Sequence, residues 1–157
     1  MLLGFQRQFA EYVEEGSKTH TIRAKRAQTP RVGETCHCYA NPRQKNMRLL
    51  GRFECVGVQA IRICPSFLDG MPLIVYLDEQ ILGIDETREF FWRDGFRDGL
   101  RSLAPLRAAA FWERTHGIKP GTAWEGILIH WRFEEGTCKS KPGRSTKSSH
   151  TPKTRAK

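Results

Sequence analysis

The 157-residue sequence contains no long apolar run. No window of about 18 residues is apolar enough to cross a bilayer as a helix. In the first seven residues, Met1–Arg7, the charge of Arg7 comes too early for a signal peptide. We therefore expect a cytoplasmic protein with no membrane partner.

Cysteine is present, but without a repeated spacing. The five cysteines are Cys36, Cys38, Cys55, Cys64 and Cys138. An odd count without a pattern argues against a disulfide framework, and the sequence has no Cys-x-x-Cys pair of the kind that binds zinc. In a strand, Cys36 and Cys38 would point alike and His37 away, so we interpret these thiols as reduced core residues. We expect no metal and no other cofactor.

The sequence also lacks a P-loop, a dinucleotide-binding fingerprint and a Gly-x-Ser-x-Gly nucleophile motif. These absences remove the usual sequence signals of nucleoside triphosphate hydrolysis, dinucleotide binding and serine hydrolysis.

Acidic residues are absent from residues 137–157, which hold seven Lys or Arg. The formal net charge of +9 belongs mostly to this stretch, because residues 1–136 carry 19 basic and 17 acidic groups. Ser, Thr, Lys and Pro dominate the stretch, which is typical of disorder. We predict one domain over residues 1–136 and a basic disordered tail over residues 137–157. The tail could attract phosphates regardless of sequence, or it could be a solubilising extension.

Apolar periodicity predicts an α+β domain in the order helix, strands, helices, strand. The expected helices cover residues 2–15, 86–93 and 103–116, and the expected strands cover residues 19–23, 34–40, 47–63, 72–77 and 124–133. Gly51 and Gly57 suggest bends or bulges in the longest strand. We expect a bent, mainly antiparallel sheet with helices at one edge or end.

Individual residues should define the helix ends and the buried faces. The first helix would bury a stripe formed by Leu2, Phe5, Phe9, Tyr12 and Val13. Gly16 suits a left-handed cap after this helix, and Asp85 can cap the start of the second helix. The third helix offers Leu106, Ala110 and Trp112 to the core.

Charge is unevenly distributed within the predicted domain. Residues 16–53 contain nine Lys or Arg and one acid, whereas residues 54–98 contain nine acids and four Arg. If the fold gathers the first group, a basic face results on which Tyr39 and His37 could stack against bases. Scattered, solvated charges are the alternative.

The segment Lys18–Arg23 combines two hydroxyls, an imidazole, an amine and a guanidinium. Arg23 can make a forked contact with a phosphate or a base edge, and a partly desolvated Lys18 could have a lowered pKa and act as a base. In an extended segment Lys18 and Thr21 would lie on opposite faces, whereas a turn could bring them together. A solvated polar loop is the alternative interpretation.

Two further histidines are weaker candidates. His116 lies near a helix end, where a cationic ring would suit the helix dipole. His130 lies on the strand face opposite Trp131 and could be exposed or line a cleft.

The run from Gly16 to Arg23 resembles the signature of the ASCH domain, a branch of the PUA-like superfamily. Further pieces that resemble the family follow in its order: Pro30–Glu34, Leu49–Arg52, Arg93–Phe96, Phe111–Trp112 and Ile127–Trp131. The resemblance covers about residues 1–134. The chain is similar to the small ASCH proteins often found in phages and prophages.

This resemblance implies a curved, PUA-like β-barrel with flanking helices and a cleft for RNA or a modified nucleoside. One similar group consists of amidohydrolases that deacetylate N4-acetylcytidine with a Lys, a Thr three residues later and a Glu near a downstream helix. Lys18 and Thr21 match the first two, and Asp94, one methylene shorter, is the nearest match to the third. Glu89 is a spare candidate by proximity.

Three functions stay open at this point. The first is a module that binds RNA or a nucleotide in a cleft beside the motif; the second is an amidohydrolase in which Lys18, Thr21 and Asp94 are catalytic; the third is an interaction protein with a vestigial cleft. We favour the first and keep the second as its alternative. The candidate ligand-binding residues are Thr19, His20, Arg23, Lys25, Arg26 and Tyr39.

Overall fold

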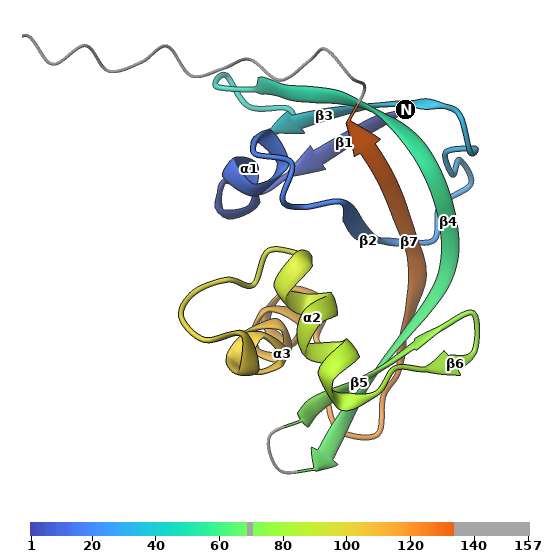
Figure 1. Ribbon diagram of the computed structural model, residues 1–157, viewed down its shortest axis with the longest axis vertical. Helices are drawn as coiled ribbons and strands as arrows, with labels where there is room; N and C mark the ends of the chain where they lie inside the picture. Colours follow the sequence, from blue (N-terminus) through green and yellow to red (C-terminus); the bar gives the residue numbers. More distant parts are fainter. Residues whose placement is uncertain (69–70, 134–157) are drawn as a thin grey trace, which may run out of the picture.

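The computed structural model describes residues 1–68 and 71–133 (Figure 1). Its elements are β1 (Leu2–Phe5), α1 (Arg7–Glu14), β2 (His20–Ala24), β3 (Thr35–Ala40), β4 (Arg48–Leu68), β5 (Met71–Leu77), β6 (Gln80–Ile81), α2 (Ile84–Arg93), the 3-10 turn η1 (Arg101–Leu103), α3 (Ala104–His116) and β7 (Trp124–Phe133). The described ranges form an α+β fold of one open seven-stranded sheet and three helices. The predicted tail, residues 137–157, lies outside the described residues. None of the described helices is long and apolar enough to cross a membrane.

Strand β4 organises the sheet because it is long enough to pair with three other strands. β3 and then β5 lie along one edge of β4, and β7 lies along the opposite edge from Phe53 to Ile63. β2 extends the sheet beyond β7, β6 extends it beyond β5, and β1 pairs in parallel with β3. Both β4 and β7 are strongly curved (Figure 1). A register shift between Cys55 and Gly57 confirms the predicted bulge at Gly57.

The curved sheet does not close into a barrel. Strands β1 and β2 end the two sides of the sheet and do not pair with each other within the described residues. A side chain bridges them instead, since Nη2 of Arg23 in β2 donates to the carbonyl oxygen of Gly4 in β1 at 2.5 Å. The opening between these two strands therefore borders the pockets described below.

The first residues form a strand followed by a helix, so the single helix predicted over residues 2–15 is wrong. Leu3 and Phe5 are buried at strand spacing, whereas Phe9 and Val13 are buried at helical spacing. Apolar side chains three or four residues apart continue across the junction, so periodicity alone merges the two elements.

The helix ends agree in part with the sequence signals. Gly16 follows α1 with a φ of 74°, as predicted for a left-handed cap. Helix α2 is capped by Gly83 rather than by Asp85, which lies in the first turn, where its charge still suits the helix dipole. The carboxylate of Glu86 accepts a hydrogen bond from the Gly83 N–H at 2.7 Å and so defines this helix start.

Helix α3 buries a face that differs from the predicted one. Trp112 is buried as expected, but Leu106 is 58% exposed and Ala110 is exposed as well. The buried positions Ala104, Ala108 and Trp112 recur every four residues. Small side chains at the first two allow α3 to lie close to its neighbours α2 and β5.

The predicted strands are present, with small changes at their ends. β3 alternates as expected, with Cys36, Cys38 and Ala40 on its buried side. The thiols of Cys36 and Cys38 therefore face the core, as predicted. The longest strand, β4, continues to Leu68, beyond the predicted end at Ile63.

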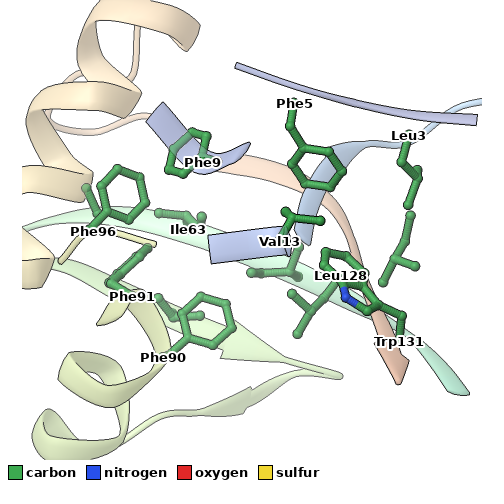
Figure 2. Close-up of a cluster of buried hydrophobic side chains, with 14 of the residues drawn as sticks. Leu3, Phe5, Phe9, Val13, Ile63, Phe90, Phe91, Phe96, Leu128 and Trp131 are labelled. Carbon is green, nitrogen blue, oxygen red and sulfur yellow. The ribbon is translucent and has the colours of Figure 1, made fainter. Parts of the chain in front are cut away.

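Aromatic side chains fill the space between the helices and the sheet (Figure 2). Phe9, Phe96 and Phe111 contact one another edge to face, with ring centroids 5.5, 5.6 and 5.7 Å apart. Phe91 contacts this group through Phe96 and is fully buried. This geometry is the preferred one for aromatic pairs, so the rings stabilise the core beyond the area that they bury.

Phe91 should therefore dominate stability near α2. We expect Phe91→Ala to lower the free energy of unfolding by about 3–5 kcal/mol, because it removes a buried ring and leaves a cavity. Phe67→Ala is the matched control: its side chain is 85% exposed, and its loss should change stability by less than about 0.5 kcal/mol. Urea unfolding monitors both variants, and equal losses would contradict this description of the core.

Candidate functional site

A lysine and an aspartate from distant parts of the chain meet inside the molecule. Lys18 precedes β2, and Asp94 is the residue that ends α2. Nζ of Lys18 donates to the carboxylate and to the backbone carbonyl oxygen of Asp94. The two residues are only 2% and 6% exposed. Breaking this pair would leave a buried charge without a partner, which proteins tolerate poorly.

Burial opposes the charged form of both partners. It lowers the pKa of Lys18, although the charge of Asp94 acts in the opposite direction. It raises the pKa of Asp94, which the charge of Lys18 again opposes. Burial thus weakens the charged form of each group, and the attraction between them offsets part of this effect. A neutral amine at Lys18 could accept a proton from a neighbouring group.

The pair is held in place by contacts around it. The backbone N–H of Lys18 donates to the carbonyl oxygen of Tyr12 at 2.9 Å. The guanidinium of Arg97 donates to the carbonyl oxygens of Ser17 and Trp92, at 2.6 and 2.9 Å. Arg97 thus ties the segment before Lys18 to the end of α2, which carries Asp94.

A pocket of about 420 Å³ reaches this pair. Lys18, Thr21, Arg23, Arg26 and Asp94 all contribute to its lining. The structure therefore brings all three residues suggested as catalytic, and two of those suggested as ligand-binding, to one cavity. Asp94 contacts Lys18 despite being one methylene shorter than Glu, because the end of α2 lies directly beside the lysine.

Thr21 lies in β2 and is buried at the edge of the pocket. Its hydroxyl makes no hydrogen bond to another group in the described ranges. Lys18 lies before the first residue of the strand, so the alternation within β2 does not separate it from Thr21. Both side chains line the same pocket.

His20 is buried and does not belong to the lining of the pocket. Its ring stacks on Phe90 with centroids 4.9 Å apart, and Nε2 lies 3.7 Å from Oδ1 of Asp94. Burial lowers the pKa of His20 well below its ordinary value, and the charge of Lys18 adds to this effect. The neutral form of the ring is therefore favoured, and its Nε2 makes no hydrogen bond to another group among the described residues.

An aromatic wall that the sequence did not indicate completes the pocket. Trp112, His116 and Trp124 all line it. The rings of Trp112 and His116 stack with centroids 4.4 Å apart, and Trp124 meets Trp112 edge on at 4.5 Å. Trp124 is half-buried and His116 is exposed.

Two local signals could have found this wall. Trp112 and His116 are four residues apart on α3 and so share a helix face. Gly126 is two residues after Trp124 on β7, and a Cβ there would lie 2.3 Å from both the Trp124 ring and the Arg23 carbonyl oxygen. The glycine therefore leaves room for the indole to lie along the strand.

Several residues proposed from the sequence lie away from this pocket. Thr19 is exposed and is not part of the lining. Tyr39 lies half-buried on β3, also outside the lining. Lys25 lines a different cavity, beside Arg62. His130 is half-buried, and its Nε2 lies 2.8 Å from Oε1 of Gln59.

Glu89, the other acidic candidate, forms ion pairs with arginines instead of with Lys18. It pairs with Arg93 and Arg101, at 2.6 and 2.8 Å. Asp94, rather than Glu89, is therefore the acid that contacts Lys18.

Comparison of the chain with protein-family models, with curated proteins and with solved structures found no match. The resemblance to the ASCH domain therefore depends on the motif residues alone.

The buried His20 predicts a pH dependence of stability. Its pKa is lower in the folded protein than in the unfolded chain, so the unfolded chain takes up the proton first as the pH falls. The resulting stability is fully present above the unfolded pKa of about 6.5 and is lost as the pH falls below it. His20→Phe should keep the stacking on Phe90 and remove this titration.

Urea unfolding of wild type and His20→Phe between pH 5 and 7.5 measures the effect. As the pH falls, the wild type should lose stability more steeply than His20→Phe. The difference in slope should be up to about 1.4 kcal/mol per pH unit, the limit for one proton. His116 and His130 also have lowered pKa values from burial, so the variant should retain a smaller slope. Identical slopes in the two proteins would contradict the assignment.

Proposed function

We propose that the protein binds RNA or a nucleotide in the 420 Å³ pocket, with a base stacked against the aromatic wall. The observation that carries this proposal is the combination of Trp124 and His116 with Arg23 and the Lys18–Asp94 pair in one cavity. Aromatic faces bind bases of any identity, whereas buried polar groups select among their edges. The volume lies within the range of small-ligand pockets, about 300–1,000 Å³.

The proposed fold family is consistent with this location. The resemblance to ASCH and PUA-like domains implies a curved β-barrel with a cleft beside the Gly16–Arg23 motif. The sheet is bent but open rather than a closed barrel. The position of the pocket beside β2 supports the expected cleft.

A second candidate function is hydrolysis of an acylated nucleoside such as N4-acetylcytidine. The specific observation in its favour is that Lys18 contacts Asp94 while Thr21 lines the same pocket. A threonine hydroxyl is a weak nucleophile until a base removes its proton. A neutral Lys18 amine, with its pKa lowered by burial, is such a base.

The proposed reaction has two halves. Lys18 takes the hydroxyl proton of Thr21, and the alkoxide attacks the acyl carbon to form a tetrahedral intermediate. The C–N bond then breaks, the departing nitrogen takes a proton from the Lys18 ammonium, and the acyl group remains as an ester on Thr21. Water, deprotonated by Lys18, opens the ester and releases the carboxylic acid and the free hydroxyl.

Asp94 and Arg23 would assist without forming bonds to the substrate. Asp94 orients the Lys18 amine through its hydrogen bond. The guanidinium of Arg23 can stabilise the negative oxygen of the tetrahedral intermediate, as preorganised donors do.

Thr21→Val tests the hydrolytic mechanism because valine keeps the shape of threonine and removes the hydroxyl. We expect the rate of cytidine release from N4-acetylcytidine to fall at least about 1,000-fold. Chromatography of the reaction mixture measures this rate. Thr35→Val is the matched control, since Thr35 is half-buried in β3 and outside the pocket. Full activity in Thr21→Val would exclude the mechanism, and no release by wild type would leave binding as the proposed function.

Trp124 tests the binding function. We expect Trp124→Leu to weaken cytidine binding about tenfold, since stacking on an aromatic ring contributes about 1–3 kcal/mol per base. Trp124→Phe keeps a ring and should retain most of the affinity. Isothermal titration calorimetry measures both, and equal affinities of wild type and Trp124→Leu would contradict a stacking role.

A further inference from the structure

A second cavity, of about 300 Å³, adjoins the first. The two cavities share Gly4, Arg23, Ala24 and Arg26 in their linings, so they adjoin at these residues. The second cavity lies at the opening between β1 and β2, with the loop after β3 contributing Pro42 and Arg43.

The second cavity is cationic. Arg23, Arg26 and Arg43 line it, and no acid belongs to its lining among the described residues. Met1 also lines it, but its N-terminal ammonium is paired with Glu34 at 2.9 Å and donates to the Thr35 carbonyl oxygen at 2.6 Å. The arginines therefore supply the uncompensated charge.

Arg23 is a fixed donor with unused hydrogen-bonding capacity. Its guanidinium bonds to the Gly4 carbonyl oxygen and lies 4.9 Å from the centre of the Phe5 ring. Its Nε is buried and has no hydrogen-bond partner in the described ranges. A guanidinium carries five N–H donors, and the contact with Gly4 uses one of them.

The position of Arg43 is also defined by packing. The N–H of Asn41 donates to the Phe5 carbonyl oxygen at 3.1 Å, which joins the loop to the end of β1. Pro42 packs so closely on Gly4 that a Cβ at Gly4 would lie 2.4 Å from its ring. These contacts place Arg43 at the cavity.

We propose that the second cavity is a phosphate subsite, so that the ligand is a base carrying a phosphate rather than a free nucleoside. This inference rests on the proposed base-binding pocket and names the ligand class for it. Arginine suits phosphate because its planar fork can donate two parallel hydrogen bonds to the anion. The phosphate can belong to a mononucleotide or to an RNA strand, which present the same chemistry to the arginines.

The test compares each of the four common ribonucleosides with its 3′- and 5′-monophosphates by isothermal titration calorimetry of the full chain. We expect at least one monophosphate to bind about tenfold tighter than its nucleoside, the gain of about one charge-assisted contact. Arg43→Gln should reduce this ratio at least about threefold while leaving nucleoside affinity unchanged.

Lys45→Gln is the matched control. Lys45 lies in the same loop, is exposed, and lines neither cavity. Because Lys45→Gln removes the same charge, both variants should lose the same long-range attraction to the phosphate. The further reduction of the ratio in Arg43→Gln then measures the direct contact. Equal affinities of nucleosides and monophosphates in the wild type would overturn the subsite, as would equal effects of the two variants.

Two further probes separate the sources and the hypotheses. If a short RNA binds tighter than the mononucleotide, and its affinity falls steeply with salt, the phosphate belongs to an RNA strand. If the RNA binds equally or more weakly, the phosphate belongs to a mononucleotide. A third outcome separates the two hypotheses. If inorganic phosphate binds to the wild type and not to Arg43→Gln, while no nucleoside binds, the phosphate subsite stands and the base pocket is overturned. No binding of any probe would overturn both.

Discussion

The contact between Lys18 and Asp94 is the interaction on which the rest of the candidate site depends. It joins the segment before β2 to the end of α2 across 76 residues of sequence, and both partners are buried. Either charge alone would be strongly unfavourable in this environment. The same burial that makes the pair a structural requirement lowers the pKa of Lys18. The stability of the fold and the proposed reactivity of Lys18 therefore have one cause, and a change at either residue should affect both.

The open sheet determines where this pair meets a ligand. The bulge near Gly57 and the length of β4 bend the sheet, yet β1 and β2 do not pair within the described residues. Arg23 bridges them by a side-chain contact, so the opening is lined by donors rather than filled by backbone hydrogen bonds. Aromatic rings from α3 and β7 complete the pocket. Flat rings, arginines and a buried lysine–acid pair in one place support the proposed planar, anionic ligand.

Local patterns in the sequence were sufficient for most of the fold. Alternation predicted β3, and the apolar run with β-branched residues predicted β4; both are present. The first helix was misplaced because strand and helix periods overlap at Phe5 and Phe9. In the site, the motif containing Lys18 and Thr21 was visible in the sequence. The sequence did not show that Asp94 would contact Lys18, or that Trp124 would form an aromatic wall. Both features depend on contacts between elements that lie far apart in the chain.

A double-mutant cycle on the buried pair tests the central claim most directly. Urea unfolding would compare wild type with Lys18→Met, Asp94→Asn and the double variant. Each single change should cost about 3–5 kcal/mol, because it leaves its partner buried and unpaired. The double variant should then lose less than the sum, with a coupling of about 1–3 kcal/mol. Losses that simply add, within about 0.5 kcal/mol, would show that the two residues do not depend on each other and would contradict this account.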